Sequence, residues 1–395
     1  MRILLFSPYG GYDQRIASRR VNIFYTQLRA AGHYVKIVRL AADRDTPSSG
    51  ESIDYNIEIL CINALTRFIE NTLTAGRPGL MLSLANFLRR LTLVDHFVYS
   101  IVGSVYKVFC IVKRDRIDTV ITSSPPFSMA IVGAIIKRLC GVRFVSDNRD
   151  WWSAGAYNES SLKLVARIRK TIEIAVHQEA SMVLTIGYNA RAWYETVFQI
   201  PACAVLSGCP SRVRTPIDFK SSREIVYAGS LYGGKRRLDI LLRALDCDEL
   251  RRKFIVRLIG AEVQSYLKWS NTFPQLLIER FGPVSKCIAD KMLRKSKYSI
   301  VLLGDDEFEL QVLPAKFYEL VSLARPLICI GSEDSEIGNL IRKNSLGICT
   351  FRSEVIRKYI LESDAEPVQD LLPDCLCSDV TFSEFIRRLH VIDLE

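Results

Sequence analysis

The chain has 395 residues, of which 49% are hydrophobic and 24% are charged, a composition typical of folded, soluble-type proteins. A chain of this length is too long for a single hydrophobic core, so we expect two domains. The formal net charge of +10 suits nucleic acid, an anionic membrane surface or phosphorylated ligands. Lysine and arginine are dispersed, and no helix-turn-helix, RNP-like or zinc pattern is present, which argues against a nucleic-acid binder.

The first half of the chain predicts a parallel α/β sheet. Residues 2–6 read as an apolar strand rather than as a signal sequence, and a helix with one apolar face follows and ends at Gly32. A strand at 34–40 completes a βαβ opening, which is typical of parallel sheets with helical crossovers. Further strands are predicted at 118–122, 142–146, 182–186 and 204–206, and a helix at 128–139 closed by Gly141.

Two stretches of this half do not follow the pattern. Residues 43–93 mix apolar and basic positions, and we predict irregular structure there. Residues 97–112 come nearest to a membrane span, but the stretch is short and is interrupted by Lys107. We therefore predict a buried helix and a cytoplasmic protein.

The second half repeats the βα pattern after a polar stretch that we take as a linker, residues 208–222. A strand at 224–228, a glycine-rich turn, a helix at 238–245 and a strand at 254–259 follow. Further strands are predicted at 298–303 and 326–330, with a helix at 314–323 between them. Two such series predict two doubly wound, Rossmann-like domains that face each other across a cleft, with ligands beyond the C-terminal ends of the strands.

The eleven cysteines do not predict a metal site. Several lie in apolar runs, as small core residues do. Only Cys375 and Cys377 lie close together, and a C-x-C pair without a second pair of ligands is not a zinc pattern. Reduced thiols are typical of the cytosol.

A charged segment follows the strand predicted at 142–146 and contains Arg149 and Asp150 before Trp151 and Trp152. Charges at the C-terminal edge of a parallel sheet lie in the ligand crevice, so Arg149 and Asp150 are candidate site residues. The alternative is an Arg–Asp ion pair within the domain, covered by aromatic packing.

A glycine-rich loop, residues 227–236, joins the strand at 224–228 to a helix. Gly229 and Ser230 would let the main chain approach a phosphate, and Lys235 and Arg236 add full positive charges. The alternative is an ordinary βα turn with a solvated basic pair.

The segment 311–320 places Pro314 at the first turn of a predicted helix, with Lys316 and Glu319 three residues apart on one face. Glu319 would accept hydrogen bonds from vicinal ribose hydroxyls, with Lys316 nearer the phosphates; the alternative is a surface salt bridge between the two. The acidic run 305–307 before it is predicted to be a solvated loop rather than a metal site.

Together and in order, these motifs resemble those of family 4 glycosyltransferases, particularly the enzymes of bacterial surface-polysaccharide synthesis. The resemblance covers residues 1–350 and rests on Ser123-Ser124-Pro125-Pro126, Asp147-x-Arg149-Asp150-Trp151, Tyr227-x-Gly229-Ser230-Leu231-Tyr232-Gly233 and Leu313-Pro314-x-Lys316-Phe317-x-Glu319. It implies a GT-B fold, retention of anomeric configuration and catalysis without a bound metal.

The resemblance also implies roles for single residues. Glu319 is similar to the second glutamate of the family's E-x7-E motif, which binds the donor ribose. Lys235 or Arg236 resembles the basic pair that holds the diphosphate, and Gly10 and Gly11 resemble the glycine loop of the N-terminal domain. The donor-binding set implied is Gly10, Gly11, Gly229, Ser230, Lys235, Arg236, Pro314, Lys316 and Glu319.

One position departs from the family pattern. Gln311 stands where the family has the first glutamate, beside the transferred sugar. A neutral amide hydrogen-bonds sugar hydroxyls but supplies no negative charge beside a developing oxocarbenium ion, so we expect Gln311 to alter donor choice. Arg149 stands where many relatives have a histidine near the acceptor. The implied catalytic set is Arg149, Asp150, Lys235, Arg236 and Gln311.

We therefore expect a retaining transferase that moves a sugar from a nucleotide-sugar, with UDP-sugars favoured, to a saccharide or lipid-linked saccharide in cell-surface polysaccharide synthesis. Residues 1–207 would form the acceptor-side domain, 223–372 the donor domain, and 373–395 a segment that packs back on the N-terminal domain. No cofactor is expected, since the nucleotide-sugar is a substrate. The alternatives are a catalytically silent nucleotide-sugar-binding subunit and a nucleotide-sugar epimerase.

A last pattern concerns the membrane. Read as a helix, residues 80–91 place Leu80, Leu84, Phe87, Leu88 and Leu91 on one stripe beside Arg89 and Arg90. An apolar stripe flanked by arginines can lie in a headgroup layer, so we predict peripheral contact with the anionic inner face of a bacterial membrane. The alternative is a helix whose stripe is core.

Overall fold

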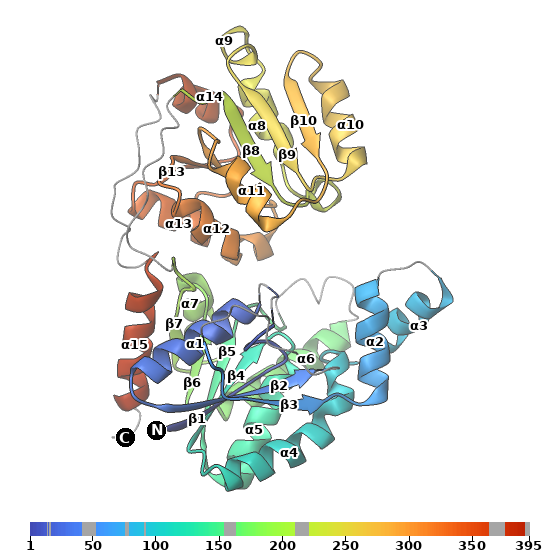
Figure 1. Cartoon of the computed structure of the whole chain (residues 1–395), viewed down its shortest axis with the longest axis vertical. Helices are drawn as coiled ribbons and strands as arrows, with labels where there is room; N and C mark the ends of the chain where they lie inside the picture. The colour runs from blue at the N-terminus through green and yellow to red at the C-terminus, as the bar shows by residue number, and fades with distance from the viewer. Residues whose placement is uncertain are drawn as a thin grey trace. The chain divides into compact units, whose positions relative to one another are not determined.

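The computed structural model describes residues 1–13, 15, 17–41, 53–75, 79–90, 92–153, 163–209, 221–362 and 376–391. The chain divides into two compact units, Met1–Ser207 with Thr381–Glu395, and Gly208–Val380 (Figure 1). We call them unit 1 and unit 2 and describe each by itself. Of the predicted linker, residues 210–220 lie outside the described part of the chain.

Unit 1 contains a seven-stranded parallel sheet in the order β3-β2-β1-β4-β5-β6-β7. Its strands are β1 Arg2–Ser7, β2 Tyr34–Ala41, β3 Ile57–Cys61, β4 Thr119–Ser124, β5 Arg143–Asn148, β6 Met182–Thr185 and β7 Ala202–Ala204. The central strands are buried along nearly their whole length, as is typical of a parallel sheet with helices on both faces: all of β4 is buried, and so is all of β1 after Arg2. The strand order reverses between β1 and β4, so the ligand crevice of such a sheet opens at their C-terminal ends.

The helices of unit 1 come from both ends of the chain. They are α1 Ser18–Ala30, α2 Ala64–Ala75, α3 Leu80–Arg90, the 3-10 helix η1 His96–Ser100, α4 Ile101–Arg114, α5 Ser128–Cys140, α6 Lys163–Gln178, α7 Tyr188–Val197 and α15 Ser378–Val391. Phe382 and Phe385 of α15 are fully buried. Their rings lie 4.7 and 5.5 Å from the ring of Phe24 in α1, so α15 completes the core of unit 1.

The structure corrects several predictions for unit 1. Residues 43–93 are not irregular, because their described part contains β3 and α2, which were not predicted, and α3, which agrees with the helix read at 80–91. The last strand is β7 at Ala202–Ala204, not 204–206; Val205 and Leu206 are buried beyond its end. Helices α6 and α7 were not predicted, since their apolar positions are interspersed with charges.

The stretch predicted as a buried helix at 97–112 is only half buried. Val108 and Ile111 of α4 lie in the core, but Val102 and Tyr106 are 85% and 70% exposed. Among the described residues, His96–Arg114 is the one helical stretch with the length and apolar content of a membrane span, and 33% of its most apolar 18 residues are buried.

Unit 2 contains a six-stranded parallel sheet in the order β10-β9-β8-β11-β12-β13. Its strands are β8 Glu224–Ala228, β9 Ile255–Ile259, β10 Leu277–Phe281, β11 Ser299–Leu302, β12 Leu327–Ile330 and β13 Gly347–Cys349. Its helices are η3 Tyr232–Gly234, α8 Leu238–Leu245, α9 Asp248–Arg251, α10 Val263–Thr272, α11 Lys286–Leu293, η4 Glu307–Gln311, α12 Ala315–Val321, α13 Glu336–Lys343 and α14 Ser353–Glu362. The order reverses between β8 and β11, which places a second crevice at the ends of these two strands.

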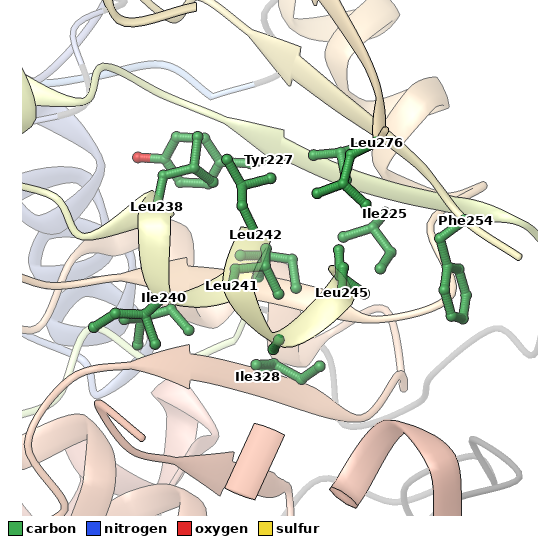
Figure 2. Packing of buried hydrophobic residues seen from close by; sticks show 14 of the residues in the cluster. Ile225, Tyr227, Leu238, Ile240, Leu241, Leu242, Leu245, Phe254, Leu276 and Ile328 are labelled. Atoms are coloured by element: carbon green, nitrogen blue, oxygen red, sulfur yellow. The ribbon is translucent and has the colours of Figure 1, made fainter. Parts of the chain in front are cut away.

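The core of unit 2 forms around α8. Figure 2 shows Leu241 and Leu245 of this helix together with Ile225 of β8 and Ile328 of β12. All four side chains are completely buried. The predicted bounds of β8 and α8 are confirmed, whereas β10 and β13 were not predicted.

Candidate functional site

The loop after β8 is held in a fixed conformation by its own side chains. Gly229 has φ +153, and a Cβ there would lie 3.0 Å from the Tyr227 hydroxyl oxygen. That hydroxyl donates to the Ser230 carbonyl oxygen at 2.9 Å. The loop therefore turns back over the ring of Tyr227, and glycine at 229 is required both by backbone conformation and by space.

A carboxylate occupies the position at which this loop offers its donors. The Ser230 hydroxyl and the Leu231 N–H both donate to Glu262, the latter at 3.2 and 3.1 Å to the two carboxylate oxygens. Burial acts to raise the pKa of Glu262, but these hydrogen bonds outweigh burial, so its pKa is lowered. The donors of Ser230 and Leu231 are therefore occupied by a carboxylate of the protein itself.

Arg236 joins this loop to the end of β11. Its guanidinium donates to the Leu302 carbonyl oxygen at 2.9 Å and to Glu309 at 2.5 Å. The Arg236 and Glu309 side chains are each only 13% exposed. Lys235 is exposed. The predicted basic pair therefore divides into a fixed arginine with a carboxylate counterion and a lysine at the surface.

Lys316 lies over the ring of Tyr227. Its ammonium nitrogen is 5.3 Å from the centre of the Tyr227 ring. Burial lowers the pKa of Lys316 to about 8, and the charge of Glu319 opposes this shift in part. Pro314 is the N-cap of α12 rather than a residue of its first turn. Lys316 thus contacts the Tyr227 ring, whereas the Arg236 guanidinium lies 5.3 Å from the centre of the Tyr232 ring. The charge of Arg236 still acts on Tyr227, because it opposes in part the rise of the Tyr227 pKa to about 12 that burial causes.

Glu319 forms an ion pair with a different lysine from the one considered in the sequence. Its carboxylate lies 2.9 Å from the Lys286 ammonium of α11, and the two side chains are 37% and 57% exposed. They line a hollow between α11 and α12, together with Asp290, Leu293, Arg294, Leu320, Ser322 and Leu323. Glu319 is therefore accessible to a ligand on the surface of unit 2.

Gln311, the last residue of η4, has a buried side-chain oxygen that accepts no hydrogen bond from the described residues. A buried oxygen of this kind can accept a hydrogen bond from a ligand hydroxyl or from water. In the acidic run before it, Asp305 is 67% exposed and pairs with Arg237, while Asp306 accepts from the Glu309 N–H at 2.9 Å. No cluster of three or more metal-ligating side chains occurs in the described ranges.

In unit 1, the glycines predicted to contact the donor serve the fold. The Gly10 N–H donates to the Ser18 hydroxyl at 3.1 Å, and the Gly11 N–H to the Asn22 side-chain oxygen at 2.7 Å. A Cβ at Gly10 would lie 2.7 Å from a methyl group of Val21. Both amides already have partners within the loop and α1.

Arg149 lies at the crevice of unit 1 and is held by main-chain carbonyl groups. It donates to Ser124, Pro125 and Ala17 at 3.2, 2.7 and 3.3 Å. Burial lowers the pKa of Arg149 and raises the pKa of Asp150, although the charge of Arg149 acts against the latter shift. The two residues adjoin at the end of β5, as the sequence predicted.

The buried ion pair of this region involves other residues. Arg20 of α1 lies 2.6 Å from Asp147, with side chains 4% and 0% exposed. Ser123 also donates to Asp147, at 2.9 Å. The Arg–Asp pair considered in the sequence therefore exists, but its arginine comes from α1. Arg20, Glu262 and Glu309 were missed, because no local motif marks them.

Neither a protein-family model nor a curated protein sequence matches the chain. Solved structures match it over nearly its whole length. The apo form of the lipopolysaccharide outer core galactosyltransferase WaaB has 12% identity and a TM-score of 0.65, with 99% of each chain covered. Anabaena Alr3699/HepE in complex with UDP-glucose has 10% identity and a TM-score of 0.63, with 99% of this chain and 100% of that one covered.

A third match is sucrose-phosphate synthase from Thermosynechococcus elongatus, with 12% identity, a TM-score of 0.65, and 99% of this chain and 100% of that one covered. These are structures of GT-B glycosyltransferases, and each sheet of this chain has their Rossmann-like strand order. The chain therefore has the GT-B fold that the resemblance implied.

Proposed function

We propose that this protein is a retaining glycosyltransferase of the family 4 type, which transfers a sugar from a nucleotide-sugar, with UDP-sugars favoured, to a saccharide or lipid-linked saccharide in cell-surface polysaccharide synthesis. The observation that carries the proposal is the arrangement around Tyr227 at the crevice of unit 2. Lys316 lies over the Tyr227 ring, and the charge of Arg236, which lies over the Tyr232 ring, acts on Tyr227. Gln311, whose buried side-chain oxygen has no partner among the described residues, lies on the same 3-10 helix η4 as Glu309.

The chemistry of the reaction explains these residue types. The bond between the anomeric carbon and the β-phosphate breaks, and the acceptor hydroxyl oxygen forms the new bond while its proton leaves with the diphosphate. Negative charge grows on the departing diphosphate, and Lys235, Arg236 and Lys316 stabilise it. Glu319 accepts hydrogen bonds from ribose hydroxyls, and Gln311 accepts one from the transferred sugar.

The similar structures support this choice of donor. Anabaena HepE was solved with UDP-glucose, and WaaB is a galactosyltransferase. Arg149 and Asp150 are the acceptor-side candidates, since they lie at the crevice of unit 1.

The test is a screen of UDP-, GDP- and ADP-sugars for thermal stabilisation, followed by product analysis with saccharide acceptors. We expect one UDP-sugar to raise the melting temperature and to yield a glycoside with the donor's anomeric configuration. Isomerised donor without an acceptor product would instead identify an epimerase. Binding without any turnover, including donor hydrolysis, would identify a silent subunit, and stabilisation by none of the three classes would refute the proposal.

A further inference from the structure

Helix α3 presents apolar side chains to solvent. Leu80, Met81, Leu84 and Phe87 are 85%, 60%, 44% and 58% exposed, whereas Ala85 on the opposite side is fully buried. In Figure 1, α3 lies at the edge of unit 1, beyond α2. The stripe predicted from the sequence is therefore not core at Leu80, Leu84 or Phe87; Leu91 lies outside the described residues. Monomeric proteins rarely expose such a contiguous patch without a partner.

Positive charge accompanies these apolar side chains. Helix α3 contains no acidic residue, and Arg89 on it is exposed. The first half of α6 has the same character: Leu164 is 67% exposed and lies between the exposed cations Lys163 and Arg167. The first acidic residue of α6, Glu173, is buried and faces inward.

Hydrogen bonds hold the chain at and after the C-terminal end of α3. The Arg169 guanidinium of α6 donates at 2.8 Å to the carbonyl oxygen of Leu93, which follows α3. The Tyr99 hydroxyl of η1 donates at 3.2 Å to the Leu88 carbonyl oxygen in α3. The segment after α3 therefore contacts α6, and we call the exposed residues of α3 and of the N-terminal half of α6 the α3–α6 surface.

We propose that the α3–α6 surface docks this protein on an anionic lipid bilayer. The apolar side chains of α3 insert among the headgroups, and the cations of α6 attract the negative surface. A bilayer fits better than a folded partner, because the apolar residues stand on one helix at the edge of unit 1 and the exposed side chains Arg89, Lys163 and Arg167 supply positive charge beside them. The inference does not rest on the proposed transfer reaction.

The test is flotation of the full chain with phosphatidylcholine vesicles, with and without phosphatidylglycerol, at low and physiological salt. We expect binding that requires phosphatidylglycerol and weakens with salt. The variant Leu84→Glu/Phe87→Glu should reduce binding by at least about tenfold, and Lys163→Glu/Arg167→Glu by a similar factor at low salt. The matched control is Leu267→Glu, at a side chain 52% exposed on α10 of unit 2, which should bind as the wild type does.

A second measurement distinguishes a loss of membrane binding from misfolding of a variant. Phe87→Trp should fold normally, and its fluorescence should shift to shorter wavelength on anionic vesicles. Failure of the wild type to float at both salts, normal flotation of the α3 variant, or an unshifted Phe87→Trp spectrum would overturn the proposal. Mass measurements that show α3-dependent dimers would assign the surface to a second copy of the chain instead. Thermal stabilisation by the donor measures donor binding, and it should be the same in the α3 variants as in the wild type. A failure of the transferase proposal would therefore be distinguishable from a failure of the membrane proposal.

Discussion

Arg236 already has a counterion, so the diphosphate of a donor must compete with Glu309. We predict that Glu309→Gln raises donor affinity, because the charge of Arg236 is then available to the ligand. The same change should lower the free energy of unfolding without donor by about 1–3 kcal/mol, since it leaves a largely buried cation without its partner. Calorimetric titration with a UDP-sugar and urea unfolding measure the two effects.

The matched control for this pair is Asp305→Asn, because Asp305 also pairs with an arginine but is 67% exposed. It should change neither quantity by more than about 0.5 kcal/mol. Weaker donor binding by Glu309→Gln would show that Glu309 contacts the donor directly.

Lys316 should make donor binding depend on pH. Its pKa is about 8 in the free protein because of burial. A diphosphate beside it favours the charged form and raises that pKa, so affinity should be full below the free pKa and fall as pH rises through 8. Titrations from about pH 6.5 to about pH 9.5 should show this fall, and Lys316→Arg should abolish it because arginine stays charged. A wild-type profile that is flat across this range would place the diphosphate away from Lys316.

Glu319 should be essential for nucleotide affinity. Glu319→Ala should weaken donor binding by about 1.5–3 kcal/mol, since ribose hydroxyls lose a charged acceptor. Lys286→Ala is the control, because it removes the observed partner of Glu319 and leaves the carboxylate in place. Equal losses in the two variants would mean that the ion pair, rather than the carboxylate, supports the site.

At this scale the sequence predicted the cations of the site better than its anions. Lys316 and Arg236 stand in recognisable local motifs. Glu262 and Glu309 follow β9 and β11, and only the strand order of the sheet brings them to the loop after β8. The spacing of residues within a short segment does not indicate which distant segments that segment will contact.

Among the elements, α15 offers a direct test of packing. Phe385→Ala should lower the free energy of unfolding by about 3–5 kcal/mol, since the fully buried ring leaves a cavity beside Phe24. Arg387→Ala on the same helix, where the side chain is 75% exposed, should change it by less than about 0.5 kcal/mol. Denaturant unfolding gives both values. A negligible effect of Phe385→Ala would show that α15 is dispensable to unit 1.

The elements that the sequence predicted well are those in which the apolar residues are buried. Helix α8 is an example, because nearly every residue of it is core. Helix α3 agrees with the helix read at 80–91, but its apolar pattern alone could not decide between a buried and an exposed stripe. Strand β3 at the sheet edge is only partly buried and has no continuous apolar run.

For the whole molecule, the division into units predicts what a fragment can do. Unit 2 has its own core and contains every donor-side residue except Gly10 and Gly11. Residues 208–380 alone should therefore fold and bind UDP, but should transfer no sugar. Circular dichroism and calorimetric titration check this, with Glu319→Ala in the same fragment as the control. The prediction would be contradicted by an unfolded fragment, or by a folded fragment that does not bind UDP although the full chain does.

The course of the chain through the units also bears on protein synthesis. Phe382 and Phe385 belong to the core of unit 1, yet they follow residue 380, the last of unit 2. A ribosome therefore releases the first 207 residues long before the side chains that cover Phe24 have been made. Unit 1 therefore cannot complete its core until all of unit 2 and the residues of α15 have been synthesised. The usual order, in which the N-terminal domain completes its fold before the next domain is made, does not apply to this chain, and nascent unit 1 is the part that chaperones would need to shield.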